Sequence, residues 1–228
     1  MIRHGKRYRQ AKVGLEQDAI LPLREGLAQV KERATAKFDE SVDIDINLSI
    51  DATKSDQVVR GAVTLPHSTG KAVRVLVFAK GEHAEKAQNL GADYVGLDDL
   101  LEKVSKGWLD FDFAVATPDV MAGVGKLAKI LGPKGLLPNK KLGTVTFDMG
   151  IVKELKQGRK FFRNDKGGSI HMSIGKKSLE IDQLYENVAI FIKALVASKP
   201  AVAKGKFVKK VTVSSTMGPG VQVNVDDL

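Results

Sequence analysis

The sequence predicts an antiparallel α+β domain, made from both ends of the chain, with a parallel α/β domain inserted in it. Three observations lead to this prediction. Strands that alternate apolar and polar residues occur near both ends, a mostly apolar strand with little alternation occurs in the middle, and helical patterns separate the strands. Alternation is typical of antiparallel sheets that face water on one side, whereas continuous apolar strands are typical of covered parallel sheets.

The chain begins with a basic run, MIRHGKRYRQAK, that no acidic residue balances. A phosphate-neutralising arm and an ordinary solvated tail fit this run equally well. The run lacks the apolar core of a signal peptide, and no later apolar run is long enough to span a bilayer, so we expect a soluble protein without a membrane partner. Its basic residues are Arg3, Lys6, Arg7, Arg9 and Lys12.

A one-sided helix and an alternating strand come next. Leu23, Leu27, Val30 and Ala34 recur at steps of three and four residues, which is the period of a helix with one apolar face. Between residues 42 and 50 every second residue is apolar, which predicts a strand with one wet face.

The middle of the chain has a βαβαβα order, which is typical of a parallel sheet. The apolar strand VRVLVFA spans residues 73–79, and FAVA at residues 113–116 is a second apolar strand. Between and after them, the sequence predicts a helix near residues 84–90, a short strand YVGL, a helix with Leu100, Leu101 and Val104, and a helix from Asp119.

The alternating pattern returns near the C-terminus, punctuated by the turn sequences NDKGG and GPG. The apolar positions of these strands are Ile170, Met172, Ile174, Val211, Val213, Val221, Val223 and Val225. A second one-sided helix lies among them, with Leu184, Val188, Phe191 and Leu195 on its apolar side.

Residues 1–67 and 160–228 are therefore expected to form one discontinuous domain, and residues 68–159 the inserted domain. The joints are placed near residues 67–71 and 158–160. Because two backbone crossings close together allow one domain to rotate against the other, the joints predict a hinge.

Charge separates along the same boundary. The chain has 36 Lys and Arg against 27 Asp and Glu, a net charge of +9, and residues 68–157 contribute only 13 against 11 of these. The terminal domain therefore carries most of the basic excess, which predicts a polyanionic partner. The chain has no cysteine, which excludes disulfides, thiolate metal sites and a cysteine nucleophile, and is typical of the cytoplasm.

The sequence contains no enzyme motif in a suitable structural context, so we expect no catalysis, no cofactor and no metal site. Gly123, Gly125 and Ala128 have dinucleotide-binding spacing but fall inside a helical pattern instead of the turn that opens it. Asp98 and Asp99 fall where a helix starts, which favours capping and dipole stabilisation over acid–base chemistry. The four histidines, none of which is paired at helical spacing, are His4, His67, His83 and His171.

Two loops remain unexplained by the fold. Residues 131–145 are rich in Gly, Pro and Lys and could either contact phosphates or simply connect two elements. The uncharged stretch SSTMGPG, residues 214–220, is expected at the rim of the sheet as a contact surface. On this basis a change of Thr216 is expected to affect stability little, and Lys209 is expected to make only a general phosphate contact with a polyanionic partner.

Several stretches together resemble the bacterial L-one family of large-subunit ribosomal proteins, and the resemblance runs nearly from end to end. It implies an antiparallel split β-α-β domain and an inserted Rossmann-like, three-layer α/β domain. The stretches are HGKRYR, TAKFDESV, SDQVVRGAVTLPH, VATPDVM, LGPKGLLPN, RNDKGGSIH and SSTMGPG.

The resemblance also implies a function. Members of this family are expected to bind the mobile stalk of large-subunit ribosomal RNA near the tRNA exit site, to assist release of deacylated exit-site tRNA, and to repress translation of their own operon mRNA. A monomer is expected when the protein is free of the ribosome. The implied RNA contacts are Lys37, Phe38, Ser41, Asp165, Lys166, Thr216, Met217 and Gly218.

Each of these residue types suits RNA, but alternatives remain open. A lysine neutralises phosphate, an aromatic ring or thioether lies against a base or ribose, and a glycine permits close backbone approach. On the residues alone, Phe38 could instead be core and Asp165 a turn former. A free-standing RNA-binding or RNA-chaperone module and a nucleotide-dependent enzyme remain the competing functions.

Overall fold

Both ends of the chain lie in one unit of the structure, and the middle of the chain forms a second unit. In a computed structural model, the first unit consists of residues 1–70 and 161–228, and the second of residues 71–160. Residues 5–15, 19–54, 56–67, 72–203 and 205–225 are described by the structure. Arg3, His4 and most of the predicted joint at 67–71 therefore lie outside the described residues.

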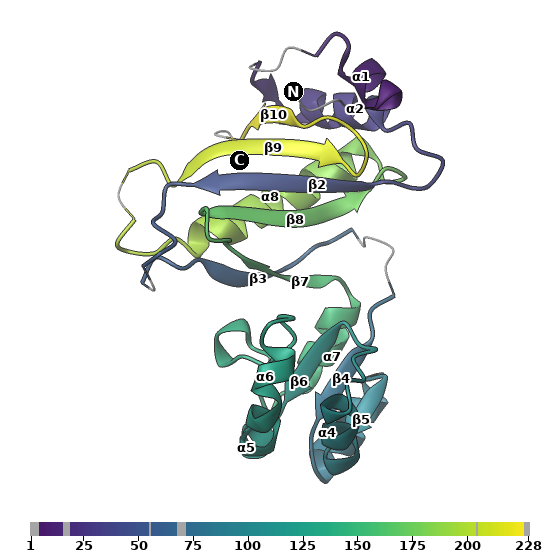
Figure 1. The fold of residues 1–228 in the computed structure, drawn as a ribbon, viewed down its shortest axis with the longest axis vertical. Helices are drawn as coiled ribbons and strands as arrows, with labels where there is room; N and C mark the ends of the chain where they lie inside the picture. The colour runs from purple at the N-terminus through teal and green to yellow at the C-terminus, as the bar shows by residue number, and fades with distance from the viewer. Residues whose placement is uncertain (1–4, 16–18, 55, 68–71, 204, 226–228) are drawn as a thin grey trace. The chain divides into compact units, whose positions relative to one another are not determined.

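The first unit is built on a five-stranded sheet with the order β1-β10-β9-β2-β8 (Figure 1). The strands are β1 (Leu21–Pro22), β2 (Ser41–Leu48), β8 (Ser169–Lys176), β9 (Val208–Ser215) and β10 (Val221–Asn224). The pairs β10–β9, β9–β2 and β2–β8 are antiparallel, which confirms the prediction from the alternating residues. The two-residue β1 differs, because it pairs with β10 in parallel.

Two helices, α2 (Leu23–Arg33) and α8 (Ile181–Ala197), cover one face of this sheet (Figure 1). The core between them contains the inward side chains of the alternating strands, and Ile44 and Ile46 are completely buried. The polar residues of the same strands lie on the opposite side, which we call the open face. Its central residues are Asp43, Asp45, Asn47, Thr212 and Ser214.

Several elements of the structure were not predicted from the sequence. They include α1 (Lys6–Lys12), α7 (Gly150–Lys156) and a two-stranded sheet of β3 (Arg60–Thr64) and β7 (Arg159–Arg163). Helix α1 has no buried residue, so the sequence carries no apolar period there. Strands β3 and β7 are mostly half-buried and begin with arginine, so they show no clean alternation.

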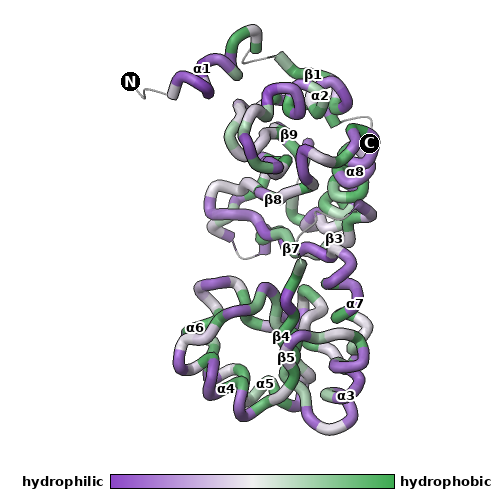
Figure 2. The backbone as a smooth tube through the Cα atoms, turned by 90° about the vertical axis from the view of Figure 1, so that its right-hand side faces the viewer, coloured by the Kyte–Doolittle hydropathy of each residue, from purple (hydrophilic) through white to green (hydrophobic). Residues whose placement is uncertain are grey.

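Helix α1 is hydrophilic (Figure 2) and is fixed by its last turn. The guanidinium of Arg33, at the end of α2, donates hydrogen bonds from Nη1 to the carbonyls of Ala11, at 2.6 Å, and Val13, at 2.9 Å. A positive charge at these carbonyls is favourable because the C-terminal end of a helix carries partial negative charge. The described part of the basic run is therefore a docked helix.

The second unit contains a parallel sheet in which β4 (Val75–Phe78) lies between β5 (Tyr94–Gly96) and β6 (Phe113–Ala116). All four residues of β4 are completely buried. Helices pack on both faces, with α4 (Asp98–Ser105) on one and α3 (Glu82–Asn89) with α7 on the other. The prediction of a parallel strand covered on both faces is confirmed.

The single helix expected from Asp119 is wrong in detail, because the segment forms four short helical turns. They are η1 (Pro118–Val120), α5 (Met121–Val124), η2 (Gly125–Leu127) and α6 (Ala128–Leu131). Two glycines lie in the middle of the segment, and glycine disfavours a continuous helix by about 1 kcal/mol relative to alanine. The apolar positions still point inward, because Val124 and Leu131 are completely buried.

The expected capping role of Asp98 and Asp99 is also wrong. Both acids lie in the first turn of α4, but the N-cap residue is Leu97, and no side chain caps the helix. Dipole stabilisation in the first turn still applies to both carboxylates. Further along, the Lys-rich loop contains one 3₁₀ turn, η3 (Lys140–Leu142).

Candidate nucleic-acid interface

The structure brings six of the eight predicted RNA contacts together and leaves two apart. The six lie where β2 begins and β9 ends, and we call them the turn cluster: Lys37, Phe38, Ser41, Thr216, Met217 and Gly218. Asp165 and Lys166 lie in the turn between β7 and β8, just before Ser169, which pairs with Asn47 at the far end of β2. Six residues of strand separate Ser41 from Asn47, which is about 20 Å.

Backbone hydrogen bonds join the two halves of the turn cluster. The Thr216 N–H donates to the carbonyl of Ser41 at 3.1 Å, and the Ser41 N–H donates to the hydroxyl oxygen of Thr216 at 3.0 Å. The threonine hydroxyl therefore extends the β2–β9 ladder by one hydrogen bond. Segments 175 residues apart in sequence become one surface through these contacts.

Glu40 fixes the turn cluster from beneath. Its side chain is completely buried, and its two carboxylate oxygens accept hydrogen bonds from the Ala36 N–H at 2.7 Å and the Met217 N–H at 3.0 Å. One buried side chain thus holds both the loop that carries Lys37 and Phe38 and the turn that carries Met217. Glu40 was not among the site residues predicted from the sequence, although it lies directly between the predicted contacts Phe38 and Ser41.

The environment of Glu40 keeps its carboxyl ionised. Burial alone would raise the pKa of the Glu40 carboxyl, but the hydrogen bonds from Ala36 and Met217 and the nearby charge of Arg7 lower it below the usual value. Hydrogen bonds to the charged form favour that form. Since Arg7 belongs to α1, the basic helix lies close enough to the turn cluster to act on it.

A second carboxylate holds the other side of the same loop. The Ser178 hydroxyl and backbone N–H donate to the Asp39 carboxylate at 2.9 Å and 3.1 Å. The Lys177 N–H donates to the carbonyl of Glu40 at 2.8 Å. The loop at residues 36–40 is therefore tied to the segment after β8 as well as to β9.

Two large apolar side chains stand on this fixed backbone and face solvent. Phe38 is 53% exposed and Met217 is 49% exposed. The alternative that Phe38 belongs to the core is therefore wrong. An aromatic ring and a thioether in this position can lie against bases or riboses at little ordering cost, because the backbone beneath them is already held.

The turn after Met217 needs residues without bulk. A Cβ built on Gly218 would lie 2.5 Å from the Ser215 hydroxyl oxygen, and one built on Gly220 would lie 2.8 Å from Cγ2 of Thr212. Both approaches are closer than real contacts allow, so side chains there would push the hairpin apart. The glycines therefore keep the turn tight and its backbone accessible to a ligand.

Asp165 is a turn former in the structure. Its Oδ1 accepts hydrogen bonds from the backbone N–H groups of Ser169, at 2.7 Å, and Gly167, at 2.9 Å, and these bonds lower the pKa of the Asp165 carboxyl. The buried Asn164 anchors the turn, because its Oδ1 accepts from the Val59 N–H at 2.8 Å. Lys166 is exposed at the tip of this turn.

The imidazole of His171, for which the sequence shows no pairing at helical spacing, lies between two carboxylates. Nδ1 of His171, on the open face, is 2.6 Å from Oδ1 of Asp45, and Nε2 is 3.6 Å from Oδ2 of Asp165. The hydrogen bond with Asp45 raises the pKa of the His171 imidazole above its usual value. Among the described residues, no group of three or more His, Asp or Glu side chains is arranged to hold a metal ion.

In the described part of the chain, no helix is long and apolar enough to cross a membrane.

The turn cluster presents one lysine, two apolar groups, a hydroxyl and accessible backbone, all on a backbone that hydrogen bonds hold in place. These groups can bind a phosphate, stack on bases and meet ribose hydroxyls.

We expect Thr216→Val to lower the free energy of unfolding by about 0.5–1.5 kcal/mol, because the Ser41 N–H loses its acceptor. This corrects the expectation that the substitution leaves stability unchanged. Thr216→Ser keeps the hydroxyl and should remain close to the wild type. Urea unfolding of both variants checks this, and equal stability of Thr216→Val and the wild type would contradict it.

The sequence of this chain is similar to those of known proteins. Residues 30–219, which include all eight predicted contacts, match a family described as "Ribosomal protein L1p/L10e family". Over 229 residues the chain is 54% identical to a protein of Methylobacillus flagellatus named large ribosomal subunit protein uL1, and the similarity covers 100% of both chains.

Proposed function

Because this chain belongs to the ribosomal protein L1p/L10e family, we propose that it binds ribosomal RNA of the large subunit through the turn cluster. The observation that carries the proposal is the pair of exposed side chains, Phe38 and Met217, on a backbone fixed by buried Glu40. Membership of a family of ribosomal proteins confirms that the chain is not an enzyme.

The finer assignments follow the resemblance and are part of the same proposal. The RNA is the mobile stalk near the tRNA exit site of the cytoplasmic ribosome, and stalk movement assists release of deacylated tRNA. The chain's own operon mRNA is a second RNA for the same cluster, so that binding represses its translation. When free, the protein is a monomer. The net charge of +9 supports polyanionic partners.

The double variant Phe38→Ala/Met217→Ala tests the proposal. We expect its affinity for a stalk fragment of large-subunit ribosomal RNA to fall about 10- to 100-fold, since stacking on a base is worth about 1–3 kcal/mol. Both side chains are about half exposed, so the thermal midpoint should stay unchanged. Filter binding or fluorescence anisotropy measures the affinity.

A matched control comes from the helix on the covered side of the sheet. Val196 of α8 is 51% exposed, so Val196→Ala removes a similarly exposed apolar group away from the turn cluster. It should leave affinity unchanged. Wild-type affinity in the double variant would refute the assignment of the site, and an equal loss in the double variant and the control would show a non-specific effect. The same double variant should bind the operon mRNA equally weakly.

We also expect residues 1–67 and 160–228, joined by a short Gly-Ser linker, to fold alone and to keep RNA affinity within about tenfold of the full chain. All eight predicted contacts and the five-stranded sheet belong to these segments. Circular dichroism and the same binding assay check the prediction. A folded fragment that binds more than about 100-fold more weakly, some 2.7 kcal/mol, would make the inserted unit a principal binder.

A further inference from the structure

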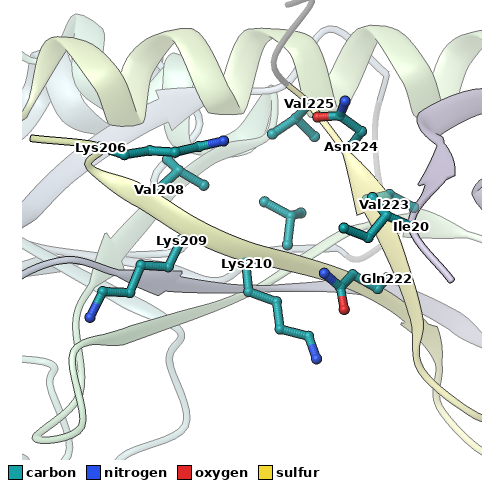
Figure 3. A pocket seen from close by; sticks show the side chains of 10 residues that line it. Ile20, Lys206, Val208, Lys209, Lys210, Gln222, Val223, Asn224 and Val225 are labelled. Carbon is teal, nitrogen blue, oxygen red and sulfur yellow. The ribbon is translucent and has the colours of Figure 1, made fainter. Parts of the chain in front are cut away.

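A hollow at the base of the β9–β10 hairpin lies far from the turn cluster and has no role in the proposed contacts. Residues from the start of β9, the end of β10 and the chain before β1 line it (Figure 3). Lys209 and Ser215 are six residues apart on β9, so the hollow lies about 20 Å from the turn cluster. We call it the hairpin-base pocket.

The floor of the pocket is apolar. Ile20, Val208 and Val225 line it, and Ile20 is 59% exposed although it is a large aliphatic side chain. Figure 3 shows Val208 at the start of β9 and Val225 just after the end of β10, with Ile20 beside Val223. An exposed aliphatic group beside a hollow provides a surface on which a flat ring or a ribose can pack.

The rim of the pocket is basic because of an irregularity in strand pairing. Asn47 of β2 pairs with Lys210, whereas the next residue, Leu48, pairs with Val208, so Lys209 is an extra residue on β9. Such a bulge re-aims side chains that strict alternation would bury. Lys209 and Lys210 are consequently both exposed, and in the view of Figure 3 both extend from the same side of β9.

Lys209 and Lys210 are both exposed in the described part of the chain. Within the described residues, no carboxylate forms an ion pair with Lys209 or Lys210. Gln222 of β10 lies beside Lys210 in Figure 3 and adds an amide that can both donate and accept. Two cations, an amide and an apolar floor are the groups that a nucleotide needs for its phosphate, base edge and ring.

The pocket lies at one end of a row of the sheet whose other end leads to the β7–β8 turn. Lys210 pairs with Asn47, which pairs with Ser169 on the other side, so Lys210 shares a row of the sheet with the start of β8. Lys166 lies in the turn just before that start. One cation therefore lies near each end of this row, with Asp45 and Asp165 around His171 on the β8 side.

We propose that the hairpin-base pocket binds an unpaired nucleotide of single-stranded RNA, with its phosphate on Lys209 and Lys210 and its base or ribose on Ile20. The choice of RNA rests on the proposed function, but the pocket is separate from the turn cluster. The chain then holds RNA at two places, a structured part at the turn cluster and a single strand at the hairpin base.

The test uses the full chain and a fluorescein-labelled oligouridine of about ten nucleotides. Lys209→Gln/Lys210→Gln should weaken binding about tenfold or more and should lower the salt slope by about 1.4, because each phosphate contact on a single strand contributes about 0.7. Ile20→Ser should weaken binding about threefold or more without changing the salt slope. Fluorescence anisotropy over a salt series gives both quantities.

A matched charge control comes from Lys126→Gln/Lys129→Gln, which removes two exposed lysines from the inserted unit. This control should leave oligouridine binding unchanged. Equal losses in both double variants would overturn the pocket, because they would show general attraction to a basic protein. Unchanged binding in Ile20→Ser would overturn the nucleotide assignment and leave only phosphate contacts. Competition by polyglutamate as effective as by unlabelled oligouridine would also overturn it, in favour of acidic peptides.

The two proposals fail separately. Phe38→Ala/Met217→Ala should lose affinity for the structured ribosomal RNA fragment and keep its affinity for the oligouridine. Lys209→Gln/Lys210→Gln should lose more affinity for the oligouridine than for the structured fragment. Loss of oligouridine binding in the turn-cluster variant, with none in the lysine variant, would overturn the pocket. Unchanged binding of the structured fragment by the turn-cluster variant, with the lysine effect intact, would refute the proposed function alone and support the pocket.

Discussion

Replacing Glu40 by alanine is expected to lower the free energy of unfolding by about 2–4 kcal/mol and the affinity for ribosomal RNA at least tenfold. The substitution leaves the Ala36 and Met217 N–H groups without acceptors, and each partly buried unpaired group costs about 1–3 kcal/mol. It also releases the loop and the turn that carry Phe38 and Met217. Chemical denaturation and binding to the stalk fragment measure the two effects.

Glu40→Gln should give an intermediate result. Its amide has one acceptor oxygen, so it can serve one of the two backbone donors, and its NH₂ group faces the other. A graded order of wild type, Gln and Ala in both stability and affinity identifies the two hydrogen bonds as the cause. The matched control is Asp182→Asn, which removes an exposed first-turn carboxylate of α8 that pairs with Arg24 at 2.9 Å; it should cost less than about 1 kcal/mol of stability and leave affinity unchanged.

The pH dependence of stability provides a further readout for Glu40. The folded-state pKa of this carboxyl lies below 4.5, so its stabilisation is fully present above about pH 4.5 and is lost as the pH falls through the folded-state value. Glu40→Gln should lack that part of the acid dependence. If the wild type and Glu40→Gln lose stability equally between neutral and acid pH, the ionised carboxylate of Glu40 does not stabilise the fold.

Asn187→Leu is expected to lower the free energy of unfolding by about 2–4 kcal/mol. The Asn187 side chain is completely buried in α8, donates from Nδ2 to the carbonyls of Ile174 at 2.8 Å and His67 at 3.1 Å, and accepts from the His67 N–H at 3.1 Å. Leucine matches its volume but leaves these backbone groups unpaired. Thermal and urea unfolding measure the loss.

The same asparagine sets the point at which the chain leaves the first unit. His67 is the last described residue before the crossing, and Asn187 holds both its N–H and its carbonyl. Amide hydrogen exchange at Leu65 and His67 should therefore become faster in Asn187→Leu. Asn89→Leu, at an exposed position in α3, serves as the control and should change neither measurement. Wild-type exchange at Leu65 and His67 in Asn187→Leu would contradict an anchoring role.

The elements that the sequence predicted correctly are those whose burial follows a period. Residues 42–48 and 184–195 bury every second or every third and fourth residue, and a regular pattern can be read without knowing the partner. Helix α1 has no such pattern, because Arg33 fixes it through backbone carbonyls and not through apolar packing. The segment from Asp119 had the right period, but the period cannot show how glycines break a helix into turns.

The candidate site was less predictable, because it depends on register. The sequence placed Thr216 and Met217 at the rim, but the pairing of Ser41 with Thr216 and the buried position of Glu40 depend on strands more than 170 residues apart. His171 becomes a partner of Asp45 only through the β2–β8 register. Lys209 is exposed because of a β-bulge, and the spacing of apolar residues in the sequence does not predict where a bulge occurs.

The order of strands in the first unit has a consequence for protein synthesis. Strand β2 leaves the translating ribosome early, yet both of its neighbours, β8 and β9, come from the last third of the chain. At about 5–20 residues per second, β2 waits roughly 10–30 s for β9, while the whole inserted unit has time to fold. A nascent chain that ends before Met217 has Phe38 but not its partner in the turn cluster, so under the proposed function truncated chains should bind RNA more weakly than finished ones.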